Sequence, residues 1–257
     1  MADPNFIGVD LAWRSDRNYT GAAVLSGSRR GAHLVAVAGP IRSRSDVRKF
    51  VADHAASVTF VAIDAPLIIP NATGQRRCET AVGARYGARE ASCHTSNQRL
   101  YPNASSVVLA AELEALGYVH APAATPTSGK VLLEVYPHAA MVALFDLPKS
   151  LKYKKGTLTQ KRQGLQTLSA HVRRLFAATP PLGCNDRLEA ILSRQTTNLS
   201  GAALKMHEDT LDAVFCAYLA YYFWYWGEQR NEVFGAVDKG YIINPRLLVG
   251  GIENYTK

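Results

Sequence analysis

An apolar run near the C-terminal end gives the most informative pattern of the chain, HEDTLDAVFCAYLAYYFWYW at residues 207–226. It begins with the acids Glu208, Asp209 and Asp212 and then continues apolar and aromatic on every side. A helix that is apolar all round belongs in a core, and the acidic start argues against a membrane span, which needs about 20 apolar residues. We predict a buried helix with Asp209 and Asp212 on one face of its first turns, because side chains three apart share a face.

Shorter apolar runs predict strands, and two of them end at an acid. The run 6–13 reaches Asp10, the run 60–67 reaches Asp64, and the run 130–139 carries Glu134. Residues 21–25 and 32–38 also have strand patterns, and their short polar links favour an antiparallel meander with the first strand. Helical spacing predicts helices at 45–56, 75–85, 105–116, 138–146, 158–177 and 185–194, and a terminal hairpin is predicted at 232–245.

These elements predict a fold of the α/β class. We expect a mixed five-stranded sheet, in which the three-strand antiparallel meander adjoins parallel strands, flanked by helices. Residues 68–128 have few apolar anchors and much Pro, Thr, Ala and Gly, so we interpret them as a helical and loop insertion. The chain, residues 1–257, is then a single domain with an insertion and a C-terminal hairpin.

The acids at the ends of the strands are the candidate chemistry. Parallel neighbouring strands end at the same edge of a sheet, about 4.8 Å apart, so we expect Asp10 and Asp64 to lie close together there. Ligand sites of open α/β sheets gather at that edge, and the buried helix can bring Asp209 and Asp212 to it. Carboxylates so close together repel unless cations neutralise them, and hard divalent ions such as Mg²⁺ or Mn²⁺ fit oxygen ligands best.

Composition and charge narrow the class of partner. The net charge of +8 favours anionic partners such as nucleic acid or nucleotides. The four cysteines are scattered without the paired spacing of a zinc site. No signal segment opens the chain, and no long apolar span follows, so we expect a cytoplasmic protein that does not insert into membranes. The sequence leaves the oligomeric state open.

Basic and aromatic side chains are candidates for binding a nucleic acid. The most basic stretch, 147–164, contains Lys152, Lys154, Lys155, Lys161 and Arg162, which we expect to hold backbone phosphates, and Arg76 and Arg77 of the insertion are candidates for clamping a phosphate. The same lysines also fit a solvated surface, and the two arginines also fit exposed positions. Candidates for stacking on bases are Tyr101, Tyr118 and Tyr136. His207 is a candidate for proton transfer, although a place beside the helix start explains it equally well.

The order of these elements resembles the ribonuclease H-like superfamily, and DTLDA at 209–213 is similar to the last motif of its Holliday-junction resolvase branch. Seven features together resemble the "domain of unknown function 429" family, which is described as predicted nucleases of this fold. They are GVDLAW (8–13), AIDAPL (62–67), RRCE (76–79), EVYPHA (134–139), the Lys/Arg run before Gln163, HEDTLDA (207–213) and GYIINP (240–245).

The resemblance implies a divalent-metal-dependent nuclease. Carried over onto this chain, it implies that Asp10, Asp64 and Asp212 bind Mg²⁺ or Mn²⁺, with Asp209 and Glu134 as further catalytic acids. Nucleases of that superfamily often carry Glu where this chain has Asp64, and the shorter side chain leaves open whether one or two ions are held.

Two other functions fit the same pattern. An actin-like or kinase-related phosphotransferase shares the first strand, its Asp and the following hairpin, but normally needs two such domains around one nucleotide. A non-catalytic nucleic-acid-binding module would keep the acids for stability. Carboxylates paired with Arg or Lys would favour the second alternative, whereas cations bridged by Asp10 would favour an enzyme.

Overall fold

The computed structural model describes residues 3–13, 18–123 and 129–247. Its centre is a seven-stranded mixed sheet in the order β5-β6-β4-β1-β2-β3-β7. The five predicted strands are all present, as β1 (Asn5–Asp10), β2 (Thr20–Ser28), β3 (Gly31–Ile41), β4 (Val58–Ile63) and β6 (Gly129–Glu134). The predicted number of five is wrong, because the short strands β5 (Tyr118–His120) and β7 (Leu182–Gly183) extend the two edges.

The strand directions follow the prediction. The strands β1, β2 and β3 form an antiparallel meander, whereas β4 runs parallel to both β1 and β6. The two edge strands are parallel to their neighbours, and each pairs over only two or three residues. Pairings so short leave little periodic signal in a sequence, which explains why the apolar pattern predicts neither edge strand.

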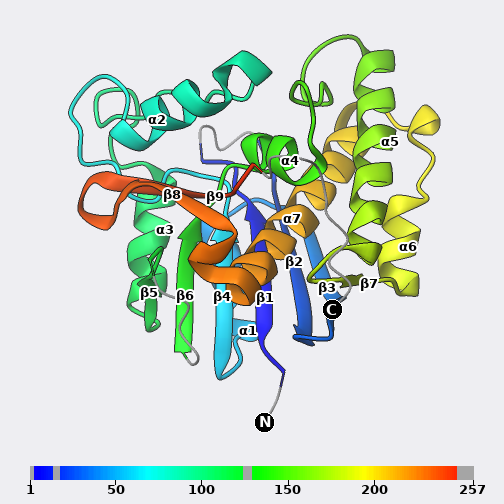
Figure 1. Ribbon diagram of the computed structural model, residues 1–257, viewed down its shortest axis with the longest axis horizontal. Helices are drawn as coiled ribbons and strands as arrows, with labels where there is room; N and C mark the ends of the chain where they lie inside the picture. The colour runs from blue at the N-terminus through cyan, green and yellow to red at the C-terminus, as the bar shows by residue number, and fades with distance from the viewer. Residues whose placement is uncertain (1–2, 14–17, 124–128, 248–257) are drawn as a thin grey trace.

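Helix α7 (Gly201–Trp226) lies across one face of the sheet, over β1 and β2 (Figure 1). It begins at Gly201, almost two turns before the predicted start at 207, so Glu208, Asp209 and Asp212 lie inside the helix and not in its first turn. The added segment, GAALKM at 201–206, is exposed or half-buried except at Leu204, so it lies outside the buried run that begins at His207. The acids therefore do not complement the helix dipole, and their burial needs another explanation.

Further helices complete two layers around the sheet. The helices α4 (Pro137–Phe145), α5 (Leu158–Arg174) and α6 (Asp186–Leu192) join α7 in the larger core cluster, where Phe145, Leu168 and Leu188 are buried. The opposite face is covered by α1 (Arg44–Asp53) and α3 (Ser105–Glu114). None of the helices in the described part of the chain is long and apolar enough to cross a membrane.

The predicted insertion is fastened to the sheet by the C-terminal hairpin. Its helix α2 (Arg77–Tyr86) packs on β8 (Asn231–Ala236), which pairs with β9 (Gly240–Pro245) (Figure 1). The Tyr86 hydroxyl donates to Glu232 at 2.6 Å, and the Tyr241 hydroxyl donates to the carbonyl of Leu132 in β6 at 2.9 Å. The insertion is thus an integral part of the domain; its predicted end at 124–128 lies outside the described residues.

Candidate functional site

Two acids meet at the carboxyl edge of the central strands. Asp10 is the last residue of β1, and Asp64 directly follows β4. The two strands pair in parallel with Val9 opposite Ile63, and the Asp64 amide donates to the Val9 carbonyl at 2.9 Å. Both carboxylates therefore leave the sheet at the same edge, as the sequence predicts.

Helix α7 brings two more acids to this edge, because glycines let it lie directly on the sheet. A Cβ on Gly8 would lie 2.1 Å from the Ala213 carbonyl oxygen, and one on Gly21 would lie 2.3 Å from the Asp209 carbonyl oxygen. At this approach Asp209 and Asp212 face the end of β1, and Asp212 is fully buried. We call Asp10, Asp64, Asp209 and Asp212 the acidic cluster.

Two lysines lie among these carboxylates. The Lys154 ammonium is 2.9 Å from Asp212 Oδ2 and 3.8 Å from Asp10 Oδ1. The Tyr153 hydroxyl donates to the other oxygen of Asp212 at 2.8 Å. On α7 itself, Lys205 donates to Asp209 and, at 2.8 Å, to Glu208. Positive charge from two different elements therefore compensates part of the cluster.

The compensation is incomplete. Burial, opposed by the charge of Lys154 and assisted by the nearby Asp10 and Asp212 carboxylates, raises the pKa of Asp64 to about 8. Burial and then the charge of Asp10 likewise raise the pKa of Asp209. Asp209 Oδ2 is buried without a hydrogen bond. Asp212 Oδ2 also accepts no hydrogen bond, but it forms an ion pair with Lys154. The cluster thus has a surplus of negative charge.

A cleft of about 290 Å³ opens onto Asp10 and Asp64. Its walls carry Lys152, Lys154 and Lys155 of the predicted basic stretch, together with the rings of Trp13, Tyr136 and His138. A smaller pocket of about 110 Å³ reaches Asp10 and Asp209 from the side of Lys205, and it is also lined by Trp13. The cleft therefore combines acids, cations and aromatic faces.

Four residues of this region are absent from our predictions of site residues. Trp13 and His138 lie in the quoted motifs GVDLAW and EVYPHA, so their place next to the acids could have suggested them. Tyr153 adjoins a predicted lysine, and Lys205 lies one helical turn before Asp209. Burial and then the charge of Lys154 lower the pKa of His138 to about 3, so this imidazole is neutral at physiological pH.

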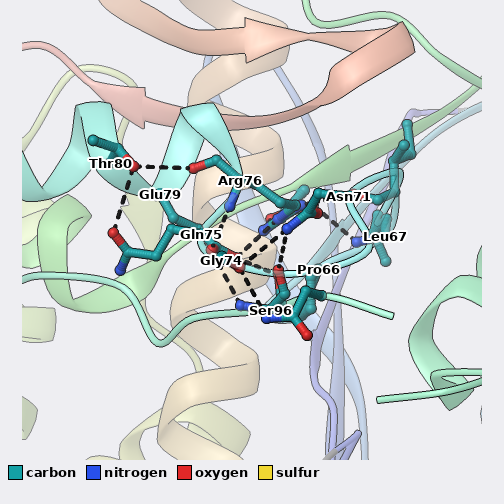
Figure 2. A network of polar contacts seen from close by, with 12 residues as sticks. Pro66, Leu67, Asn71, Gly74, Gln75, Arg76, Glu79, Thr80 and Ser96 are labelled. Atoms are coloured by element: carbon teal, nitrogen blue, oxygen red, sulfur yellow. Dashed lines mark hydrogen bonds and ion pairs between the residues drawn. The ribbon is translucent and has the colours of Figure 1, made fainter. Parts of the chain in front are cut away.

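Arg76 and Glu79 belong to a buried network of polar contacts (Figure 2), and the buried Glu134 joins this network through Arg76. The Arg76 guanidinium donates to Glu134 at 2.9 Å and, at 2.8 Å, to Glu79, which also accepts from the Ser96 amide. Glu134 further accepts from the Leu67 amide at 2.8 Å. Arg76 is only 3% exposed, so its position favours fixing the insertion to β6 over the predicted clamping of a phosphate.

Replacing Arg76 by methionine should therefore destabilise the fold. Glu134 and Glu79 would remain buried without their cation, and removal of one partner of a buried pair costs about 3–5 kcal/mol. The adjacent Arg77 is exposed, so Arg77→Met should change the free energy of unfolding by no more than about 0.5 kcal/mol. Urea unfolding of both variants measures the difference, and equal stabilities would contradict the structural role of Arg76.

The other predicted binding residues divide between the cleft and the surrounding structure. Lys161 and Arg162 lie on α5, where Arg162 donates to the Leu199 carbonyl at 2.9 Å. Tyr101 packs edge-on against Trp13, 4.6 Å between ring centroids. Tyr118 is buried in the core, so the prediction that it stacks on a base is wrong in this fold. His207 is also buried, and desolvation lowers its pKa to about 4.

The acidic cluster is chemically suited to a hard cation, but the side chains do not form a ready-made ligand set. Carboxylate oxygens are the ligands that Mg²⁺ and Mn²⁺ prefer, and Asp209 Oδ2 is buried without a hydrogen-bond donor, although Oδ1 of the same carboxylate is paired with Lys205. Within the described residues, however, no three His, Cys, Asp or Glu side chains are arranged to hold a metal ion. Lys154 lies where Asp10 and Asp212 approach each other.

The raised pKa values predict that the protein in EDTA loses stability as the pH rises. Folded Asp64 and Asp209 retain protons that the unfolded chain releases above about pH 4. Their contribution is complete below that value and is lost as the pH passes through about 8. His138 and His207, whose pKa values are lowered, contribute stability above about pH 6.5 and change little beyond it.

We therefore expect the free energy of unfolding to fall between about pH 6.5 and 8.5, by at most about 1.4 kcal/mol per pH unit for each proton released. Urea titrations across this range measure the slope. Asp64→Asn removes one of the carboxyl groups whose pKa is raised and should make the slope shallower, whereas stability that rises with pH would contradict the shifts.

The family is shown by comparison with known proteins. A comparison with curated proteins finds no match. The family model described as "Protein of unknown function (DUF429)" matches residues 8–238, which include the end of β1 with Asp10, the whole of β4 and the Asp64 that follows it, the insertion and the whole of α7. The chain therefore belongs to the DUF429 family of proteins of unknown function.

Proposed function

We propose that the chain is a phosphodiester hydrolase that acts on nucleic acid at the acidic cluster, with Mg²⁺ or Mn²⁺ as its cofactor. The observation that carries the proposal is the convergence of Asp10, Asp64, Asp209 and Asp212 from three separate segments, with Asp10 and Asp64 lining a cleft that also carries Lys152, Lys154 and Lys155. A meander followed by parallel strands, with α7 across the sheet, supports a ribonuclease H-like fold. Burying the carboxylates of Asp10, Asp209 and Asp212 so close together is costly, and such clusters are typical of functional sites.

The residues have distinct roles in this proposal. Asp10, Asp64 and Asp212 would hold the cation, which when bound supplies an activated water and stabilises the leaving oxygen. Asp209 faces Asp10 and would orient that water. The exposed Lys152 and Lys155 at the mouth of the cleft would hold backbone phosphates, which position a nucleic acid without reading its sequence.

The aromatic wall of the cleft supports a nucleic acid over a small phosphate ester. Trp13 and Tyr136 are partly exposed and line the same cleft as the lysines. Such rings stack on bases of any sequence, each worth about 1–3 kcal/mol. The neutral His138 beside them adds a polar contact without further positive charge.

Purified protein is tested against single-stranded, duplex, hybrid and branched DNA and RNA, with Mg²⁺, Mn²⁺ or EDTA. We expect cleavage of at least one substrate with a divalent ion and none with EDTA. Cleavage that is equal with EDTA, or absent for every substrate with both ions, would contradict the proposal.

A non-catalytic nucleic-acid-binding module is the second candidate. It is favoured by the ion pairs of Lys154 with Asp212 and of Lys205 with Asp209, which compensate carboxylates without a metal. Under this function, a filter-binding assay detects nucleic acid binding that EDTA does not alter, and no product forms.

A further inference from the structure

The contacts of Asp212 show what a cation must displace at this site. Asp212 is fully buried, and its two oxygens face two consecutive residues of one loop, the Tyr153 hydroxyl at Oδ1 and the Lys154 ammonium at Oδ2. A metal ion that binds Oδ2 competes directly with Lys154 and leaves the Tyr153 contact intact.

The loop at residues 146–157 holds Lys154 in place. Tyr153 is fully buried and its ring lies 5.4 Å from that of His138. On the other side, Gly164 of α5 lets the loop pass closely, since a Cβ there would lie 2.4 Å from the Lys152 carbonyl oxygen. The packing of its neighbours therefore fixes the position of Lys154 beside the acidic cluster, whereas the side chain of a surface lysine is free to move.

Charge balance gives the reason for a lysine at this point. Lys205 is shared by Glu208 and Asp209, so five carboxylates face two ammonium groups at this edge, and negative charge is in excess when all are ionised. A divalent cation would reduce this excess. The second oxygen of the buried Asp209, which has no hydrogen-bond donor, is a further sign that a cation fits here.

We propose that Lys154 is an internal counter-ion that occupies the metal position between Asp10 and Asp212 and is exchanged for the divalent ion when the metal binds. This deepens the proposed function, since it assigns the regulation of metal binding at the same site. Lys154 weakens the affinity for metal and protects the fold from carboxylate repulsion when no metal is bound. Its 27% exposure gives the ammonium a path to the cleft when it leaves Asp212.

The test is the Mn²⁺ affinity of the full chain, measured by electron paramagnetic resonance and by calorimetry. Lys154→Met should bind Mn²⁺ about tenfold or more tightly than the parent chain, because a close competing charge has been removed. Lys154→Arg keeps the charge and should bind no more tightly than the parent. Lys155→Met removes an exposed lysine of the same cleft and should change the affinity by less than about threefold.

Thermal unfolding gives a second readout. Without metal, Lys154→Met should melt below the parent chain, and Mn²⁺ should raise its melting temperature by more than it raises that of the parent. If this variant is unfolded without metal, refolding on addition of Mn²⁺ supports the proposal, and failure to refold overturns it. Unchanged or weaker Mn²⁺ binding by a folded Lys154→Met also overturns it.

The two proposals fail separately. If Lys154→Met tightens Mn²⁺ binding but the parent cleaves no nucleic acid, the counter-ion is right and the nuclease is wrong. If cleavage requires a divalent ion and Lys154→Met does not gain affinity, the nuclease is right and the counter-ion is wrong.

Discussion

Replacing Asp10 by asparagine is expected to lower nucleic acid cleavage more than about 100-fold, because even residues that merely orient a metal ligand are worth about 10–100-fold. Asp10 lies between the cleft and the pocket on the side of Lys205, and its carboxylate affects both Asp64 and Asp209. No other acid of the cluster borders both spaces. Initial rates at saturating Mn²⁺ measure the loss.

The substitution should not unfold the protein, since an amide at this point reduces repulsion within the cluster. The control is Asp53→Asn on α1, an exposed carboxylate that pairs with Lys49 at 2.6 Å, on a helix that covers the face of the sheet opposite to α7. It should retain full activity. Cleavage by purified Asp10→Asn at the parent rate would remove Asp10 from the mechanism and would indicate a contaminating nuclease or another site.

Replacing Gly8 by alanine is expected to lower the free energy of unfolding more than any other substitution that adds a single methyl group to the sheet. The new Cβ would lie 2.1 Å from both the Ala213 oxygen and the Ala217 nitrogen, which are backbone atoms of α7. Overpacking of a core costs about 1–3 kcal/mol where side chains can adjust, and here the whole helix must move. We expect a loss of about 3 kcal/mol or more, measured by urea unfolding.

The same substitution should damage the site, because α7 carries Asp209 and Asp212 on the turns that flank Ala213. We expect any folded fraction to bind Mn²⁺ more weakly than the parent. Gly83→Ala is the matched control, since its nearest atom is the Ser92 hydroxyl at 3.8 Å and it lies within α2. Alanine in a helix should stabilise by about 0.5–1 kcal/mol. Equal effects of the two substitutions would contradict the close contact.

The sequence predicts the five main strands, most helices and the meeting of Asp10 with Asp64, because strand patterns and a parallel crossover fix a common edge. It also places Asp212 among apolar neighbours, which is a sign of costly burial. The position of Lys154 could not be derived in this way. Its contact with Asp212 depends on how an irregular loop passes over Gly164, and such loops have no periodic signal.

Arg76 illustrates the second limit of the sequence. An arginine pair in a polar insertion has the same pattern whether it faces solvent or a buried acid. Only the packing of α2 under the C-terminal hairpin brings Arg76 within 2.9 Å of Glu134, which lies 58 positions further along the chain. Glu134 lies at the end of a strand, as predicted. Its charge is neutralised by Arg76, however, so we do not count it in the acidic cluster.

The contact of α7 with Gly8 also has a consequence for the order of biosynthesis. The helix that covers β1 and completes the cluster is translated about two hundred residues after the strand it packs on. During translation, the apolar face of β1 and β2 therefore stays exposed until α7 is made. Contacts between residues so far apart in sequence also form slowly. The acidic centre and the core layer that α7 fills consequently form in one late step, so a ribosome-bound fragment that lacks residues 201–226 has neither, whereas the core on the face of α1 and α3 does not need this helix.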